Sequence, residues 1–133
     1  MIDGELTDTS IPNTYQIKEL IIGNKVTKIA NRAFVSIHSM TALYIPNSVT
    51  VIDKQAFYEC ISLEKITIPN SVTSIGEQAF ADCYALTILN LPDNTININK
   101  NAFLFSPISS IPNRTTEQIR QWFDNDVFGY GDG

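Results

Sequence analysis

The sequence has few of the side chains on which most enzymes depend. Its 133 residues include one histidine, His38, and two cysteines, Cys60 and Cys83. A single histidine placed away from both cysteines in the sequence cannot complete a Ser/His/Asp or Cys/His arrangement. The sequence also has no Gly-rich phosphate loop and no cluster of carboxylates. We therefore expect a protein that is not an enzyme and that uses no cofactor and no metal.

Positive charge and long apolar runs are also lacking. Nine Lys and Arg residues stand against 14 Asp and Glu, which gives a formal net charge of −5 at pH 7. Binding to a phosphate backbone needs a concentrated Lys/Arg surface, so this composition argues against a nucleic-acid partner. A membrane helix needs about 18 consecutive apolar residues, and no apolar run in this sequence approaches that length. We therefore expect no membrane insertion.

The N-terminal stretch MIDGELTDTSIPN lacks the basic and apolar regions of a signal peptide. As written, the chain is expected to stay in the cytoplasm, and this expectation holds only if the chain is not a fragment. Two cysteines are too few for a disulfide scaffold, and free thiols are the favoured state.

What the sequence does contain is a repeat of 23 residues. The hexapeptide IPNSVT occurs at Ile45–Thr50 and again, unchanged, at Ile68–Thr73. The dipeptide Ala-Phe recurs at the same interval, ending at Phe34, Phe57, Phe80 and Phe103. The 19 Ile residues outnumber the 8 Leu, and β-branched Ile suits a pleated, packed surface better than a helix.

Each unit predicts two short strands separated by turns. Ile66 and Ile68 alternate as inward residues of the first strand, and Pro69 ends it because proline has no backbone donor. Ile75 lies on the second segment, and a turn or short helical piece then carries Phe80 into the centre. One unit cannot bury this face alone, but units stacked about 4.8 Å apart can. We therefore predict a mainly β solenoid in which the four Phe residues form one unbroken interior column.

The unit from Leu63 to Cys83 carries the specific pattern L-x-x-I-x-I-P-x-S-V-T-x-I-G-x-x-A-F-x-x-C. It resembles the BspA-like class of leucine-rich repeats. The resemblance implies a right-handed superhelix of about four to five coils with parallel strands. It predicts an N-terminal cap or partial coil over residues 1–16, four repeats over 17–108, and a C-terminal partial coil, capping helix and flexible tail over 109–133. The resembling family is chiefly secreted or on the cell surface, and is associated with adhesion.

The capping helix is expected where the repeat pattern gives way to RTTEQIRQWFDND. Ile119, Trp122 and Phe123 share one face of such a helix. That face would cover the last coil, since the end of a solenoid needs covering. The alternative is that it docks a partner or a second copy of the chain.

The exposed residues of the first strands are the best candidates for function. They fall into columns, and those proposed for a partner face are Ile21, Tyr44, Lys65, Thr67, Ile88 and Asn90. Aliphatic and aromatic groups on such a surface are typical of an interaction site. The β-propensity of Ile, Tyr and Thr explains the same residues without any partner. A column of Thr27, Thr50 and Thr73 instead predicts a hydroxyl ladder that supports the sheet.

Two functions remain open at this point. The first is a protein-binding module of the adhesion type that uses the strand face. The second is a structural or assembly subunit, or a spacer, of a larger particle or surface protein. Self-association through the solenoid ends would favour the second, and a strict monomer in light scattering would favour the first.

Overall fold

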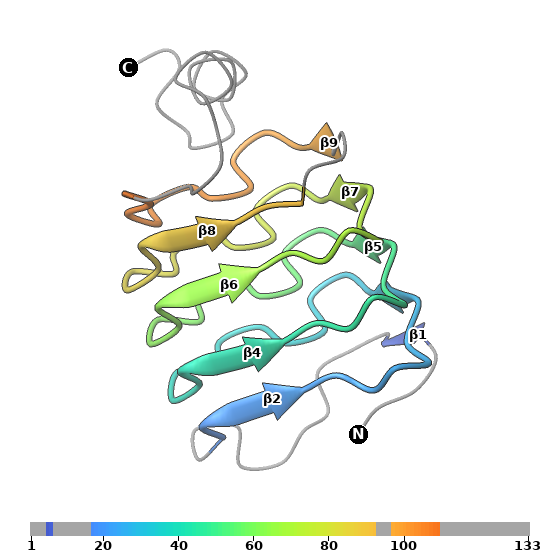
Figure 1. The fold of residues 1–133 in the computed structure, drawn as a ribbon. Helices are drawn as coiled ribbons and strands as arrows, with labels where there is room; N and C mark the ends of the chain where they lie inside the picture. The colour runs from blue at the N-terminus through green and yellow to red at the C-terminus, as the bar shows by residue number, and fades with distance from the viewer. Residues whose placement is uncertain (1–4, 7–16, 93–96, 110–133) are drawn as a thin grey trace.

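The computed structural model describes residues 5–6, 17–92 and 97–109, and within them the chain forms a parallel β solenoid (Figure 1). Each coil carries two short strands. One set of strands is β2 (Glu19–Ile21), β4 (Ala42–Tyr44), β6 (Lys65–Thr67) and β8 (Ile88–Asn90). The other set is β1 (Glu5–Leu6), β3 (Lys28–Ile29), β5 (Val51–Ile52), β7 (Ser74–Ile75) and β9 (Asn97–Ile98).

The shorter strands form one continuous five-stranded sheet in the order β1-β3-β5-β7-β9. Each strand pairs in parallel with the strand one coil away, as in the register Ile29↔Ile52 and Ile52↔Ile75. The other set forms two separate two-stranded sheets, β2-β4 and β6-β8. We call the surface made by β2, β4, β6 and β8 the strand face. Figure 1 shows the strand face and the five-stranded sheet on two sides of the stacked coils.

The two-residue period of a strand decides which side chains enter the core. On β2, β4, β6 and β8 the middle residue is buried, and the residues on either side of it are exposed or half-buried. These middle residues are Leu20, Leu43, Ile66 and Leu89. Their side chains point between the strand face and the five-stranded sheet, so the apolar core runs along the solenoid axis.

The predicted Phe column is confirmed. Neighbouring rings of Phe34, Phe57, Phe80 and Phe103 stack with centroids 5.5, 5.2 and 5.5 Å apart and interplanar angles of 14°, 10° and 5°. All four side chains are buried. Each ring therefore contacts its own counterparts on the coils beside it, as the 23-residue spacing requires.

The Ala-Phe segments are turns and contain no helix in the described residues. Two positions in each of these turns have a left-handed backbone, although none is a glycine. The first position is filled by Arg32, Gln55, Gln78 and Asn101, and the second by Ser36, Glu59, Asp82 and Phe105, all with φ between 56° and 62°. At the first position, Arg32 donates to Gln55 Oε1 at 2.8 Å and Gln55 Nε2 donates to Gln78 Oε1 at 2.7 Å. The polar side chains thus link successive coils.

The two cysteines occupy a buried slot that also makes hydrogen bonds. The Sγ atoms of Cys60 and Cys83 each lie 3.4 Å from the carbonyl oxygen of a Phe, that of Phe34 and Phe57 respectively. In the next coil Ser106 takes the same place, and its hydroxyl donates to Phe80 O at 2.6 Å. Both thiols are free, in agreement with the prediction.

The threonine hydroxyls of Thr50 and Thr73 donate to main-chain oxygens, whereas the sequence predicts a ladder in which the hydroxyls bond to one another. Thr50 Oγ1 donates to the main-chain oxygen of Thr27, and Thr73 Oγ1 donates to that of Thr50, each at 3.2 Å. The main-chain N–H groups of the same residues donate to the same oxygens at 2.8 and 2.9 Å. The column therefore reinforces the coil-to-coil pairing beside the five-stranded sheet.

The predicted capping helix, with Ile119, Trp122 and Phe123, lies outside the described residues. The division into residues 1–16, 17–108 and 109–133 also stays a prediction.

Candidate functional site

The strand face places the predicted partner residues side by side. Ile21 and Tyr44 are register neighbours on β2 and β4, and their exposed fractions are 51% and 53%. Thr67 faces Asn90 across the β6–β8 pair, where Asn90 Nδ2 lies 3.4 Å from Thr67 Oγ1. An aromatic and an aliphatic side chain are therefore exposed together on this face, rather than singly.

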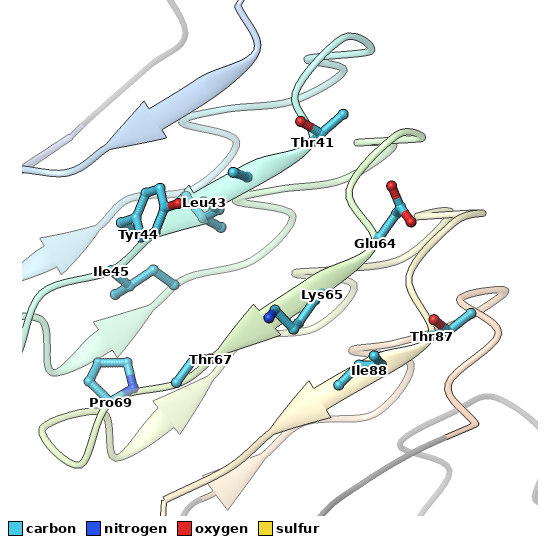
Figure 2. Close-up of a pocket in the computed structure, with 11 residues that line it drawn as sticks. Thr41, Leu43, Tyr44, Ile45, Glu64, Lys65, Thr67, Pro69, Thr87 and Ile88 are labelled. Atoms are coloured by element: carbon cyan, nitrogen blue, oxygen red, sulfur yellow. The ribbon is translucent and has the colours of Figure 1, made fainter.

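A groove of about 660 Å³ opens on this face between β4 and β6 and reaches β8. We call it the β4–β6 groove (Figure 2). Its lining residues are Thr41, Ala42, Leu43, Tyr44, Ile45, Glu64, Lys65, Thr67, Pro69, Thr87 and Ile88. Its size falls within the range of ordinary ligand pockets.

The groove brings together Tyr44, Lys65, Thr67 and Ile88 of the predicted set. The other two predicted residues, Ile21 and Asn90, lie on the same face but do not line the groove.

Sequence reasoning misses several groove residues. Leu43 and Ile45 are inward positions of the repeat, and Pro69 reads as a strand terminator. The repeat does identify four further lining residues as outward positions of this face, because they fall in its exposed columns: Thr41, Ala42, Glu64 and Thr87.

The hydrogen-bonded ladder of the strand face is interrupted at the groove. Ile22 N–H donates to Tyr44 O at 3.1 Å, and Ile68 N–H donates to Asn90 O at 2.8 Å. Among the described residues no register joins β4 to β6, and Ile45 N–H makes no bond of this kind to Thr67 O. The structure differs here from the uniform ladders that a strict repeat predicts.

The small side chain of Ala42 adds room at the interruption. The same column position carries Glu19 on β2, Lys65 on β6 and Ile88 on β8. The charges of the groove, those of Glu64 and Lys65, have opposite sign and are adjacent in sequence, so the lining has no net formal charge. The rest of a chain with a net charge of −5 therefore carries the acidic excess.

The single histidine belongs to a small polar cluster and does not form a catalytic arrangement. His38 Nε2 lies 3.1 Å from Glu59 Oε1, and Ser36 Oγ donates to the same oxygen at 2.9 Å. Both hydrogen bonds lower the pKa of the Glu59 carboxyl, and the bond with His38 has the larger effect. In a hydrolase triad the imidazole lies between the hydroxyl and the carboxylate. Here the carboxylate lies between the other two, so it cannot relay a proton from Ser36 to His38.

The thiols are equally unsuited to nucleophilic chemistry. Burial raises the pKa of Cys83 to about 12 and raises the pKa of Cys60 as well. Only the thiolate is a nucleophile or a metal ligand, so these side chains stay inert at neutral pH.

In the described part of the chain, no three His, Cys, Asp or Glu side chains group as a metal site. Within the same residues no helix is long and apolar enough to cross a membrane.

The family is shown by a model of the BspA-type leucine-rich repeat region, which matches residues 5–128 in six copies. The chain belongs to this family of leucine-rich repeat proteins. Such repeats generally serve as protein-interaction modules and are typically not enzymes. The predicted resemblance is therefore confirmed. No curated protein matches the chain.

Several solved structures share the fold. A leucine-rich repeat protein of T. pallidum (TpLRR) matches with a TM-score of 0.72 and 22% identity over 83% of this chain and 51% of its own. A leucine-rich repeat protein of Bacteroides ovatus matches with a TM-score of 0.75 and 24% identity over 98% of this chain and 35% of its own. A leucine-rich cell surface protein of Faecalibacterium prausnitzii matches with a TM-score of 0.54 and 22% identity over 72% of this chain and 41% of its own. The chain thus spans about half or less of the length of these three proteins.

Proposed function

We propose that the chain is a non-enzymatic protein-binding module of the adhesion type, and that it binds its partner through the strand face. The observation that carries the proposal is the exposure of Ile21 and Tyr44 as register neighbours, beside a groove of about 660 Å³. Tyr is enriched among the residues that dominate binding energy, because it combines a large apolar ring with a polar end.

The arrangement suits a macromolecular partner better than a small substrate. The candidate residues lie on several coils in succession, so contacts are spread along the solenoid instead of converging on one reacting atom. Neither the Ser36–Glu59–His38 cluster nor the buried thiols lines the groove. The fold alone does not decide the function, so the proposal depends on this face.

The proposal is tested by capture of a partner with a variant of the face. The intact chain and the double variant Tyr44→Ala/Thr67→Arg are immobilised and exposed to native extract of the source cells, and retained proteins are quantified. Tyr84→Ala is the matched control, because Tyr84 is 58% exposed and is not a groove residue.

The intact chain and Tyr84→Ala should retain the same amount of the partner. The double variant should retain at least about tenfold less, which corresponds to a loss of about 1.4 kcal/mol in binding free energy. The melting temperature should stay within about 2 °C, because both substitutions lie on the surface. Equal retention by the double variant would show that another surface binds. A large fall in melting temperature would show that these residues belong to the core.

A further inference from the structure

A second exposed aromatic surface lies outside the strand face, on the segments that follow the Ala-Phe turns. Tyr84 and Phe105 are each 58% exposed. We call the five residues after the buried Phe of each coil the turn edge, which comprises residues 35–39, 58–62, 81–85 and 104–108. Single exposed hydrophobic residues are normal on a protein surface, but two that lie together indicate a site of interaction.

The repeat places the two aromatic residues on adjacent backbone positions. His38 and Glu59 are 21 residues apart, and their side chains meet with Nε2 3.1 Å from Oε1. Tyr84 and Phe105 are the equivalents of these two residues two repeats later. Glu59 and Phe105 also share a left-handed backbone, with φ of 62° and 61°. Among the described residues, neither exposed ring stacks on another ring, so both rings have faces available to a ligand.

A carboxylate lies beside the aromatic pair. Asp82 N–H donates to Leu104 O at 2.7 Å, which fixes Asp82 next to Phe105 on the following coil. Tyr58 Oη donates to Asp82 Oδ2 at 3.0 Å. Phe105 is thus an aromatic residue at a position that is polar in the other coils, where it is filled by Ser36, Glu59 and Asp82.

Two carboxylates are neighbours in this column. Glu59 N–H donates to Ala81 O at 2.9 Å, so Glu59 and Asp82 lie on adjacent coils at the same position. The hydrogen bond to Asp82 raises the pKa of the Tyr58 phenol, and burial and the charges of Asp82, Glu59 and Tyr84 raise it further. These acidic groups therefore surround one hydroxyl. Like charges side by side on neighbouring strands are unfavourable, and a bound cation would relieve the repulsion.

The turn edge supplies no permanent cation of its own. None of its residues is Lys or Arg. Within the described part of the chain, Asp82 forms no ion pair, and the cationic contact of Glu59 is with His38, which is charged only when protonated. The turn edge therefore combines exposed aromatic rings with carboxylates that lack a permanent counter-charge.

We propose that the turn edge binds an arginine side chain of a basic polypeptide partner, with the guanidinium packed against the exposed rings of Tyr84 and Phe105 and donating to the Asp82 carboxylate. This site is separate from the strand face and goes beyond the proposed function.

Shape and charge together favour arginine over other side chains. A guanidinium is planar and permanently charged, stacks on aromatic faces, and donates two parallel hydrogen bonds to a carboxylate. A lysine ammonium carries the same charge but is compact and strongly hydrated, so it gains less from a flat ring. The net charge of −5 adds attraction at longer range.

The site has room for this ligand without a change in the solenoid. Tyr84 and Phe105 lie on the outside of the turns and are more than half exposed. A side chain that packs on them does not separate the coils, so the buried Phe column behind the turns stays stacked.

The test measures binding of synthetic peptides by fluorescence anisotropy. A blocked peptide of alternating Gly and Arg is compared with matched peptides in which Lys or citrulline replaces Arg. Citrulline keeps the planar shape without the charge, and its peptide should bind at least about tenfold more weakly than the Arg peptide. The Lys peptide should be intermediate. Affinity for the Arg peptide should fall between about 50 and about 300 mM NaCl, because exposed charges are screened.

Two substitutions separate the carboxylate from the ring. Asp82→Asn keeps an acceptor for Tyr58 and removes the charge, and Phe105→Ser supplies the residue that already fills the same position as Ser36. Each should weaken the Arg peptide at least about tenfold. Glu77→Gln is the matched control, because it removes one negative charge from an exposed residue outside the turn edge and should change the affinity less than about twofold. Melting temperatures show that each variant is folded.

Equal weakening by Asp82→Asn and Glu77→Gln would show a diffuse attraction to an acidic chain and overturn the proposal. Undiminished binding of the citrulline peptide, full binding by Phe105→Ser, or no binding of the Arg peptide would overturn it as well. Loss of the Arg peptide with Tyr44→Ala/Thr67→Arg would place it on the strand face instead. Tyr84→Ala should weaken the Arg peptide and keep the strand-face partner, so failure of this proposal leaves the proposed function standing.

Discussion

Phe57 lies against Phe80 with the ring centroids 5.2 Å apart and the ring planes 10° from parallel. Each ring also stacks on a further Phe on its other side. Both side chains are buried, so a residue in the middle of the column is packed by two aromatic neighbours from other coils. The stability of one coil therefore depends directly on the next.

We predict that Phe80→Ala lowers the free energy of unfolding by about 3–5 kcal/mol, the usual cost of removing a buried ring. This is a large fraction of the about 5–15 kcal/mol expected for the whole domain. Denaturant titration followed by circular dichroism measures the change. Phe105→Ala makes the same chemical change at a side chain that is 58% exposed, and should cost no more than about 0.5 kcal/mol. Equal losses at the two positions would contradict the role of the column.

Gly76 should not tolerate a side chain. A Cβ placed on it would lie 2.5 Å from Lys54 N and 2.6 Å from Asp53 C, both main-chain atoms of the preceding coil. We predict that Gly76→Ala costs about 1–3 kcal/mol of unfolding free energy through overpacking. Asp53→Ala is the comparison, because the equivalent residue of the preceding coil already carries a Cβ. It removes only exposed contacts, the ion pair with Lys28 and the hydrogen bond from Lys54 N–H, and should cost at most about 1 kcal/mol. If both substitutions shift the denaturation midpoint equally, the close approach of the coils at Gly76 is not the cause.

The buried Phe column could be predicted from the sequence because each of its positions has an equivalent 23 residues away. A ladder of Phe rings needs no information beyond that spacing. The left-handed turn positions are not predictable in the same way. Gln55 and Glu59 occupy them without the glycine that usually signals a positive φ, and hydrogen bonds to adjacent coils maintain the turns.

The groove shows where prediction from the repeat fails. Ile45–Thr50 and Ile68–Thr73 are identical in sequence, yet only Ile68 N–H makes the main-chain bond to the next coil. The two segments differ in the strand of the next coil that they meet: β4 is followed by β6, with which it does not pair, and β6 is followed by β8, with which it does. No local motif reports it. Tyr44 and Lys65 are recognisable as exposed positions, whereas the groove between them is a property of the stacking.

The thiols should be protected in the native state. Burial raises the pKa of Cys83 to about 12, and that of Cys60 is raised further from its usual range. Because the thiolate is the reactive form, we predict negligible reaction of native protein with an aromatic disulfide reagent at pH 8. Both thiols should react within minutes after unfolding in guanidinium. Rapid labelling of the native chain would show that the slot opens, and a mass lower by two hydrogens would show a disulfide.

Glu59 should make a pH-dependent contribution to stability. Hydrogen bonds from His38 and Ser36 lower its pKa, so the ionised carboxylate is favoured in the folded state. The contribution is then fully present above the ordinary pKa of Glu, about 4.3, and is lost as pH falls through the lowered pKa. We predict that Glu59→Gln is less stable than the native chain at pH 6 and that the difference shrinks at pH 3. Because the group is exposed, salt should also shrink it, and a difference that persists unchanged at pH 3 would contradict the assignment.

Ile22, Ile45 and Ile68 occupy equivalent positions at the ends of β2, β4 and β6, and their amides provide the sharpest check on the groove. Ile22 N–H and Ile68 N–H donate to the next coil at 3.1 and 2.8 Å, whereas Ile45 N–H makes no such bond among the described residues. We predict that Ile45 exchanges its amide hydrogen at least about tenfold faster than the other two, after correction for intrinsic rates. Nitrogen-15 NMR in deuterium oxide resolves the three amides.

Equal protection of all three amides would mean that β4 and β6 pair in solution. Exposure of Ile21 and Tyr44 does not depend on that ladder, because both lie on strands whose pairing with each other is intact. The exchange experiment therefore separates the groove, which depends on one missing ladder, from the strand face, which does not.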